Sequence, residues 1–420
     1  MTTRNYTQII ALVAGVNAPV DNASAVGNGS QDVSVNGMDP GHNNYQMDGV
    51  SITPLGAGSP EQSFYSGIGI PSPDAITEFN IQTSLYDASY GRNPGANVNV
   101  VTRSGTNAWH GTAFEFFRNT DLNANSFFQD RSGGGKQPLN QNQFGEVVGG
   151  PIKKGKLFIF GSYQGTRQKN GVDPTGNSTG ATLPPIPAGD RNAPGFQRAL
   201  GQAFCDDPTY SQKIGLGGVR VACDGSNINP VVLNILRLKN PNGTYYIPGS
   251  TTGTYSTATF IDPDIYSEEQ YLVNADYLVS RRNTIATRYF YSREHQSQGF
   301  NCLIMANACL PGAGQNDGFN NTAAVLKVTS LLSTSLVNEA RVSFQRDESY
   351  LGTKQQFTDT EVGITPVTPQ IDFLAPLTVL GQFDSGGQTE PNFNVTNQFQ
   401  WGDQISWSRG KHTVRAGGEF

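Results

Sequence analysis

The region from residue 107 to residue 420 is dominated by segments in which apolar and polar residues alternate. In residues 335–349, one face carries Leu336, Ala340, Val342 and Phe344, and the other carries Glu339, Arg341, Ser343, Gln345 and Asp347. The candidate strands are His110–Asn119, Asn142–Ile152, Lys156–Gln168, Glu268–Ser280, Asn283–His295, Asn321–Leu332, Ser335–Ser349, Phe393–Trp407 and His412–Phe420. Their lengths are near the ~9–11 residues that a tilted strand needs to cross a bilayer. One apolar and one polar face, repeated strand after strand with exceptions such as Asp403 on an apolar face, suits a wall between lipid and a wet lumen.

The connections between these segments alternate strictly between long and short. The long ones are 120–141, 169–267, 296–320 and 350–392, and the short ones are 153–155, 281–282, 333–334 and 408–411. A soluble antiparallel sandwich also alternates its faces, but nothing in it sorts connections by length. Outer-membrane barrels have short periplasmic turns and longer extracellular loops. Residues 107–420 are therefore predicted to form about nine strands of an antiparallel transmembrane β-barrel with long extracellular loops.

Composition is consistent with such a wall. Only 15% of residues are charged, against about a quarter in soluble domains. The net charge of -6 leaves no basic excess to follow a phosphate backbone, so no nucleic-acid partner is expected. The sequence contains no run of about 18 apolar residues, so no transmembrane helix is predicted. The opening residues lack the basic end and apolar core of a signal peptide, so we expect the natural amino terminus to lie upstream.

Residues 1–106 have a different pattern of short elements separated by Gly, Pro and Asn. We predict a short helix at 6–13 and strands near 31–35, 45–52, 78–83 and 96–102, with Asp74 as the cap of one helical turn. We therefore predict a small α+β unit here. Because the barrel region is much longer, the fold class of the chain as a whole is mainly β.

Several stretches together resemble one family. They are Asn44-Tyr45-Gln46-Met47-Asp48-Gly49-Val50, Pro73-Asp74-Ala75-Ile76-Thr77-Glu78-Phe79, Ala88-Ser89-Tyr90-Gly91-Arg92, Val98–Asn107, His110–Asn119 and Gly149-Gly150-Pro151-Ile152. The chain resembles TonB-dependent outer-membrane receptors, and especially the Oar-like group, which often carries a carboxypeptidase-regulatory-like domain ahead of its plug. The resemblance covers the whole chain, is dense over residues 4–168 and is thinner in the loops.

The resemblance implies that residues 1–106 are a plug domain whose amino-terminal part is missing. The structural plug motif would comprise Asn44, Tyr45, Asp48, Gly49, Glu78, Gly91 and Arg103. Asp48-Gly49 suits a tight hairpin turn, and Gly91 with Gly95 suits a sharply bent loop. Siderophore-type plugs carry a second acid and a basic residue where this chain has Asn80 and Thr83. A polar lock between plug and barrel would then use Glu78 and Arg103.

A plug of this size implies a large barrel, because 22-stranded barrels hold a plug whereas eight-stranded ones are filled by side chains. About nine strands cannot close such a barrel, so we expect a fragment that contains the plug and the first barrel strands. Phe420 offers a second interpretation, since proteins of this family commonly end in Phe.

The cysteines fall into two local pairs, Cys205 with Cys223 and Cys302 with Cys309, both in predicted extracellular loops. We interpret them as loop disulfides of an oxidising compartment, with free thiols as the alternative. The four histidines are far apart and no CxxC is present, so we expect no metal site and no cofactor. The sequence contains neither a nucleophile elbow nor a paired-acid motif, so we do not expect an enzyme.

The family implies energy-coupled uptake of a large nutrient across the bacterial outer membrane. The partners would be outer-membrane lipid, an unknown large ligand, and the TonB complex through a segment outside this sequence. Polar loops with scattered aromatics suit a chelate, an oligosaccharide or a peptide equally. Two alternatives remain, an outer-membrane structural or adhesion protein of the same fold and, more remotely, a secreted glycan-binding β-sandwich.

Overall fold

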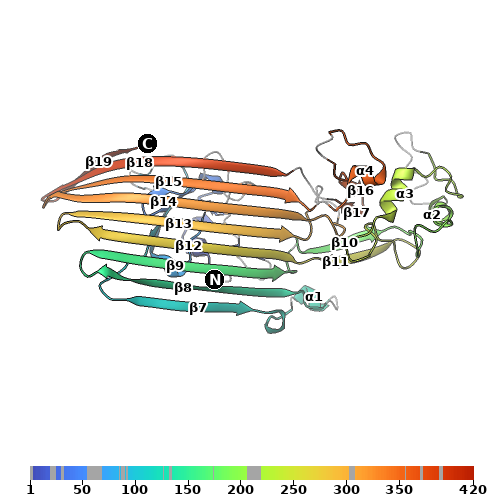
Figure 1. Cartoon of the computed structure of the whole chain (residues 1–420), viewed down its shortest axis with the longest axis horizontal. Helices are drawn as coiled ribbons and strands as arrows, with labels where there is room; N and C mark the ends of the chain where they lie inside the picture. The colour runs from blue at the N-terminus through green and yellow to red at the C-terminus, as the bar shows by residue number, and fades with distance from the viewer. Residues whose placement is uncertain are drawn as a thin grey trace.

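The computed structural model describes residues 3–18, 25–29, 33–53, 69–84, 86, 90, 93–125, 127–131, 135–173, 175–205, 219–301, 308–354, 356–368, 372–386 and 391–420. These residues form three parts, the wall, the plug and the cap (Figure 1). The wall is the large sheet that runs the length of the molecule.

The wall is a nine-stranded antiparallel sheet in which neighbours in the chain are neighbours in space, apart from the insertions at its loop end. Its strands are β7 (His110–Arg118), β8 (Leu139–Lys153), β9 (Leu157–Asn170), β12 (Asp264–Leu278), β13 (Asn283–Gln298), β14 (Gln315–Ser333), β15 (Leu336–Thr353), β18 (Asn392–Arg409) and β19 (His412–Glu419). Within the described residues β7 and β19 are the two edges, so the sheet is open. The predicted fold class, a plug followed by an incomplete antiparallel barrel, is confirmed.

Most wall strands extend further toward the long connections than the sequence predicted. β14 has 19 residues and β15 has 18, and Gln315 of β14 is already paired with Thr353 of β15. These outer ends are rich in Gln, Asn and Asp, and Asn and Asp have low strand propensity. Hydrogen bonding to both neighbouring strands outweighs that propensity. The observed connections are consequently shorter than predicted, at 119–138, 171–263, 299–314 and 354–391.

The plug contains a four-stranded sheet of order β4-β3-β6-β5. Its elements are β3 (Asn44–Met47), β4 (Val50–Ser51), β5 (Ile76–Gln82) and β6 (Asn97–Thr102), with the small pair β1 (Val16–Asn17) and β2 (Ser34–Val35) and the 3-10 helices η1 (Tyr6–Leu12), η2 (Pro40–His42) and η3 (Pro73–Ala75). The predicted strand at 45–52 is in fact a hairpin. Asp48 and Gly49 turn it with positive φ angles of 52° and 88°, as the favoured two-residue hairpin turn requires.

Two local predictions in the plug need correction. The segment 6–13 forms the 3-10 helix η1 rather than an α-helix. Asp74 is not the cap of its helical turn, because Ser72 occupies the N-cap position and Asp74 lies inside η3. Its carboxylate is taken by an ion pair described below.

One hydrophobic cluster joins plug and wall. Tyr45, Met47, Val98 and Val100 of the plug are buried together with wall residues that include Phe160, Leu272 and Phe290. Each fully buried side chain of this size contributes roughly 1.5–3 kcal/mol. The plug is thus packed on the inner face of the wall and has no separate core.

The cap consists of the described residues of 171–263 and 354–386, at the right of Figure 1. It contains β10 (Asn177–Leu183), β11 (Ser256–Ile261), β16 (Leu377–Val379), β17 (Phe383–Ser385), α2 (Phe196–Phe204), α3 (Pro230–Arg237) and α4 (Asp359–Val362), while η4 (Thr120–Leu122) and α1 (Phe127–Arg131) lie in the first connection. The cap has its own cluster of buried apolar side chains, Leu200, Leu236, Tyr246 and Phe383 among them. Among the described helices, none is long and apolar enough to span a membrane.

Gly105 lies where the chain passes from plug to wall, against the main chain of β8 and β9. A Cβ atom there would come within 2.7 Å of the Gly150 carbonyl oxygen and would also meet the main chain of Ile159. We predict that Gly105→Ala destabilises the protein by about 1–3 kcal/mol, as overpacking does. The midpoint of thermal unfolding in detergent measures this. Gly161→Ala is the matched control, since its Cβ meets nothing within 4 Å; equal midpoints for the two variants would refute the prediction.

Candidate functional site: the plug–wall interface

The inner face of the wall carries a set of buried carboxamides. Side chains on a strand alternate between its two faces, so glutamines two residues apart share the face that meets the plug. They are Gln141, Gln143, Gln164, Gln168, Gln270, Gln345, Gln398 and Gln400. Buried amides are stable only when they are hydrogen-bonded.

Five of these glutamines donate to main-chain carbonyl oxygens of the plug. The Nε2–O distances are 3.2 Å for Gln143 to Thr3, 2.9 Å for Gln168 to Ala25, 2.7 Å for Gln270 to Ile70, 3.0 Å for Gln345 to Ile52 and 2.8 Å for Gln400 to Ser51. Two of them also accept from the plug, Gln168 from the Gly27 amide at 2.7 Å and Gln400 from the Ser51 amide at 3.3 Å. The wall side chains therefore supply hydrogen-bond partners for peptide groups of the plug that would otherwise need a neighbouring strand as their partner.

A charged cluster holds the hairpin turn of the plug to the wall. Asp48 is buried and accepts from the Thr102 amide at 3.0 Å and from the Thr102 hydroxyl at 2.7 Å. Arg288 of β13 reaches the same carboxylate, with Nε 3.8 Å from Asp48 Oδ2, and donates through Nη1 to Asp276 Oδ1 at 2.8 Å. One guanidinium thus lies between a plug carboxylate and a wall carboxylate.

A second charged contact joins the beginning of the plug to β7. Arg4 forms an ion pair with Asp74 and stacks on the rings of Phe114 and Phe116, with 4.3 Å to each centroid. Phe116 faces the plug, because it is paired with the inner-face residue Gln143 of β8 and even-numbered residues of β7 share that face.

The predicted plug-motif residues have separate positions. Tyr45 is in the core, and Asn44 donates to Asn97 at 3.1 Å inside the plug. Glu78 is exposed on β5. Arg103 donates from Nε to the Ile76 carbonyl at 3.1 Å, within the plug, and its own carbonyl accepts from Asn274 of the wall at 2.7 Å. Gly91 lies outside the described residues.

Sequence reasoning missed the residues that make the interface. It singled out neither the glutamines nor Arg288 and Asp276 as contacts of the plug. A signal existed in the recurrence of Gln at every second position, as in Gln141-Asn142-Gln143 and Gln398-Phe399-Gln400. Which plug groups they meet depends on contacts between residues more than a hundred positions apart.

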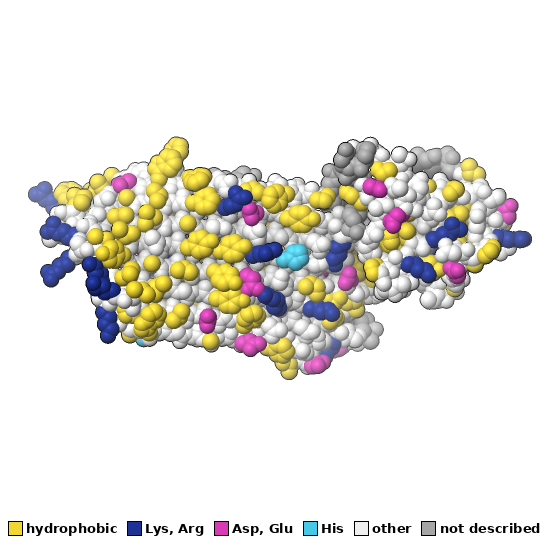
Figure 2. Space-filling view, in the orientation of Figure 1, with side chains coloured by type: hydrophobic (Ala, Val, Ile, Leu, Met, Phe, Trp, Pro, Cys, Tyr) yellow, Lys and Arg dark blue, Asp and Glu magenta, His cyan; other side chains and the backbone are white. Residues whose placement is uncertain are grey.

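The outer face of the wall is largely apolar between the short turns and its loop end, where charged side chains such as Arg167 and Glu269 are paired (Figure 2). Figure 2 shows hydrophobic side chains across the sheet and dark blue Lys and Arg side chains at the end where the short turns lie. Tyr163, Tyr271 and Tyr291 form a row across β9, β12 and β13, with successive ring centroids 5.1 and 6.4 Å apart. Exposed apolar residues on this face include Val273, Leu326, Val342, Phe399 and Trp401, as a lipid-facing surface requires.

The cap is held by a disulfide and by buried polar groups. Cys205 and Cys223 form a disulfide; Cys309 is also disulfide-bonded, and Cys302 lies outside the described residues. Arg191 donates to the carbonyls of Leu236, at the end of α3, and Ile247, at 2.6 and 2.8 Å. Burial lowers the pKa of the Arg191 guanidinium to about 10 and raises the pKa of the Tyr246 hydroxyl to about 12. Both keep their ordinary charge at neutral pH. In the described residues, His, Cys, Asp and Glu form no group suited to a metal ion.

Comparison with known proteins agrees with this architecture. Residues 1–98 match the TonB-dependent receptor plug domain, and residues 101–420 match an outer membrane β-barrel domain. The chain belongs to the TonB-dependent receptor family. This receptor is therefore a protein of the bacterial outer membrane, and its family is one of transporters and receptors.

Relatives of the receptor are known at the level of sequence and of fold. It is 30% identical over 189 residues to the TonB-dependent transporter Oar of Myxococcus xanthus, a match covering 42% of this chain and 16% of that protein. The siderophore receptor PirA of Acinetobacter baumannii superposes with a TM-score of 0.55 at 11% identity, covering 99% of this chain and 45% of that one. The outer membrane transporter YddB of Escherichia coli gives 0.52 at 10% identity, covering 92% and 41%. The chain thus spans less than half the length of these relatives.

The largely buried Arg288 cluster generates a prediction. Arg288→Met leaves the buried Asp48 and the largely buried Asp276 without their cation, and removing one partner of a buried ion pair costs about 3–5 kcal/mol. We expect a lowered unfolding midpoint and faster proteolysis of the plug in detergent.

The matched control is Arg346→Met. Arg346 pairs with Glu348 on the wall, at 2.7 Å, but its side chain is 40% exposed. Loss of an exposed pair costs about 0–1 kcal/mol. If both variants retain the native midpoint and the native rate of plug proteolysis, the Arg288 cluster does not hold the plug.

Proposed function

We propose that this receptor performs TonB-dependent, energy-coupled uptake of a large ligand. The observation that carries the proposal is the hydrogen-bonded plug–wall interface. Each carboxamide-to-carbonyl contact contributes a net ~0.5–1.5 kcal/mol, because water replaces it when it opens. A plug held by several such bonds is stable at rest and can still be displaced into a hydrated lumen by an external pull.

The proposed orientation follows the lengths of the connections. The short turns lie in the periplasm, where TonB acts on the plug, and the long connections with the cap lie outside the cell. In outer-membrane barrels the longer loops are the extracellular ones. Ligand would then meet the cap and the outer surface of the plug first.

The relatives do not specify the ligand of this receptor, so we propose a broad ligand class. PirA is a siderophore receptor and Oar a transporter, but the likeness to PirA concerns the fold. We propose a large nutrient, a chelate, an oligosaccharide or a peptide, taken up without chemical conversion.

A second function is favoured by one specific feature, the cap. It has a hydrophobic cluster of its own and a disulfide, so it can present a stable surface to another macromolecule. The receptor would then act in surface organisation or adhesion, with the same fold and no import.

A crosslink between plug and wall separates these functions. Ser51→Cys and Gln400→Cys place thiols at a contact in which the Gln400 side chain bonds both the amide and the carbonyl of Ser51. In cells that express the complete receptor, joining these thiols with a short bifunctional reagent is expected to abolish TonB-dependent uptake and leave surface binding intact. Each single-cysteine variant treated in the same way serves as control.

Two results would contradict the uptake proposal. One is full uptake by receptor whose crosslink is verified by mass spectrometry. The other is adhesion by a complete receptor that supports no TonB-dependent uptake of any nutrient class, which would establish the second function.

A further inference from the structure

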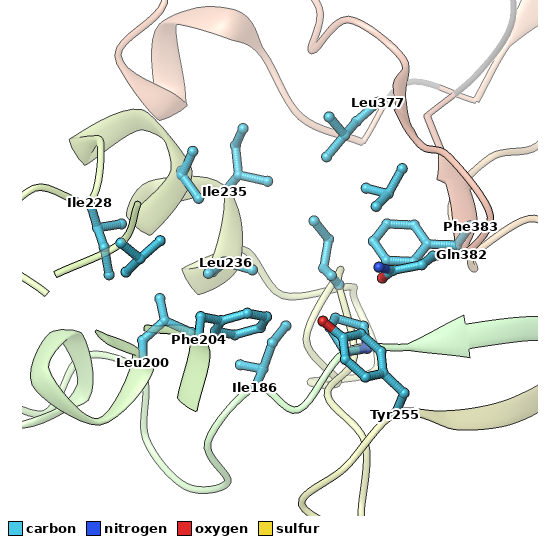
Figure 3. A pocket seen from close by; sticks show the side chains of 15 residues that line it. Ile186, Leu200, Phe204, Ile228, Ile235, Leu236, Tyr255, Leu377, Gln382 and Phe383 are labelled. Carbon is cyan, nitrogen blue, oxygen red and sulfur yellow. The ribbon is translucent and has the colours of Figure 1, made fainter. Parts of the chain in front are cut away.

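The cap contains a pocket of about 380 Å³, within the range of about 300–1,000 Å³ typical of small-molecule sites. Side chains from α2, α3, β16 and the segments around them point toward one space (Figure 3). Leu200 and Phe204 come from α2, Ile235 and Leu236 from α3, and Phe383 from β17. None of the residues that line the pocket takes part in the plug–wall contacts described above.

The lining is almost wholly hydrocarbon. None of the fifteen described residues that line the pocket is charged, and polar side-chain groups come from Tyr255 and Gln382. Such walls penalise a charged chelate, because an ion moved out of water needs a partner. They also penalise a peptide, which brings one amide and one carbonyl per residue into the pocket. A hydrocarbon chain requires no hydrogen-bond partner.

The pocket is open to water on one side. Val232 on its rim is 46% exposed and Leu377 is 38% exposed, whereas Ile186, Leu236 and Phe383 deeper inside are buried. An amphiphile fits this gradient, with its chain against the buried residues and its polar head in solvent. Exposed apolar surface of this kind commonly marks a binding site.

A covalent bond fixes two walls of the pocket. Phe204 is followed by Cys205, and Val221 lies two residues before Cys223, so the disulfide ties these two lining segments together. A cross-link of this kind restricts the disordered states in which the walls would separate. The pocket is therefore held open as a preformed site, which lowers the cost of binding.

We propose that the cap binds the hydrocarbon chain of a medium-length amphiphile in this pocket. Binding buries the apolar rim and is driven by removal of hydrocarbon from water. The inference goes beyond the proposed uptake and does not depend on it, because it concerns equilibrium binding by the cap alone.

Photolabelling tests the site. The probe is decanoic acid with a photoreactive diazirine near the end of its chain, added to the receptor in lipid nanodiscs. Label on lipid-facing wall strands is an internal reference for the probe dissolved in the bilayer. We expect additional label on the cap within 186–204, 228–236 and 377–383, and we expect excess decanoic acid, but not acetate, to remove it. Label confined to the wall, or cap label that decanoic acid does not displace, overturns the proposal.

Matched variants locate the label. Val232→Arg places a charge at the rim and is expected to reduce cap label about tenfold relative to wall label, equivalent to about 1.4 kcal/mol. Val219→Arg is the control, because Val219 is in the same region, is 82% exposed and does not line the pocket. Mass spectrometry of the Cys205–Cys223 peptide verifies that each variant has folded.

A second variant guards against an effect of charge alone. Ile228→Trp fills the pocket without adding charge and should reduce cap label in the same way. Unchanged cap label in both pocket variants, with the disulfide intact, refutes the site. None of these results bears on uptake, so failure of the two proposals can be told apart.

Discussion

The plug meets the wall through main-chain groups that must be hydrogen-bonded in a place where little water reaches them. An unsatisfied buried peptide group costs about 1–3 kcal/mol, so the inner face of the wall cannot be uniformly apolar. Glutamines at alternating positions solve this, because a carboxamide can donate to a carbonyl and accept from an amide at once. The position of the plug on the wall depends on these contacts.

The interface combines two kinds of attraction with different consequences. Apolar packing of Met47, Val98 and Val100 against Phe160 and Leu272 is lost in full when the surfaces part. The carboxamide contacts exchange with water at a small net cost. The Arg288 cluster lies between these cases, since its charges are largely buried at rest and become fully hydrated on release. A plug held partly by polar contacts is stable at rest and can still be released, which suits a family in which the plug is acted on from outside.

Much of the wall could be predicted from sequence because its physics is local. Alternation within each strand and the length of each connection require no knowledge of distant residues, and all nine strands were found in this way. The polar outer ends, as at Gln315, were missed because pairing with two neighbours overrides weak strand propensity. The Asp48–Arg288 contact joins residues far apart in sequence, and no local pattern specifies it. The folded cap was read as loop, because its two short strand pairs and three short helices are stabilised by a cluster assembled from separate connections.

The glutamine contacts are directed at carbonyl oxygens, and carbonyl oxygens are the same in every residue. The wall therefore recognises the path of the plug backbone and is indifferent to what stands at Ile52 or Ile70 as a hydrogen-bonding partner. A change of side chain at such a position leaves the hydrogen bond in place, although Ile52 and Ile70 are themselves buried in the apolar cluster shared with the wall. In an exchange of plugs between related barrels, the glutamine contacts would require only the same backbone path, whereas the Asp48–Arg288 contact would also require the same side chains.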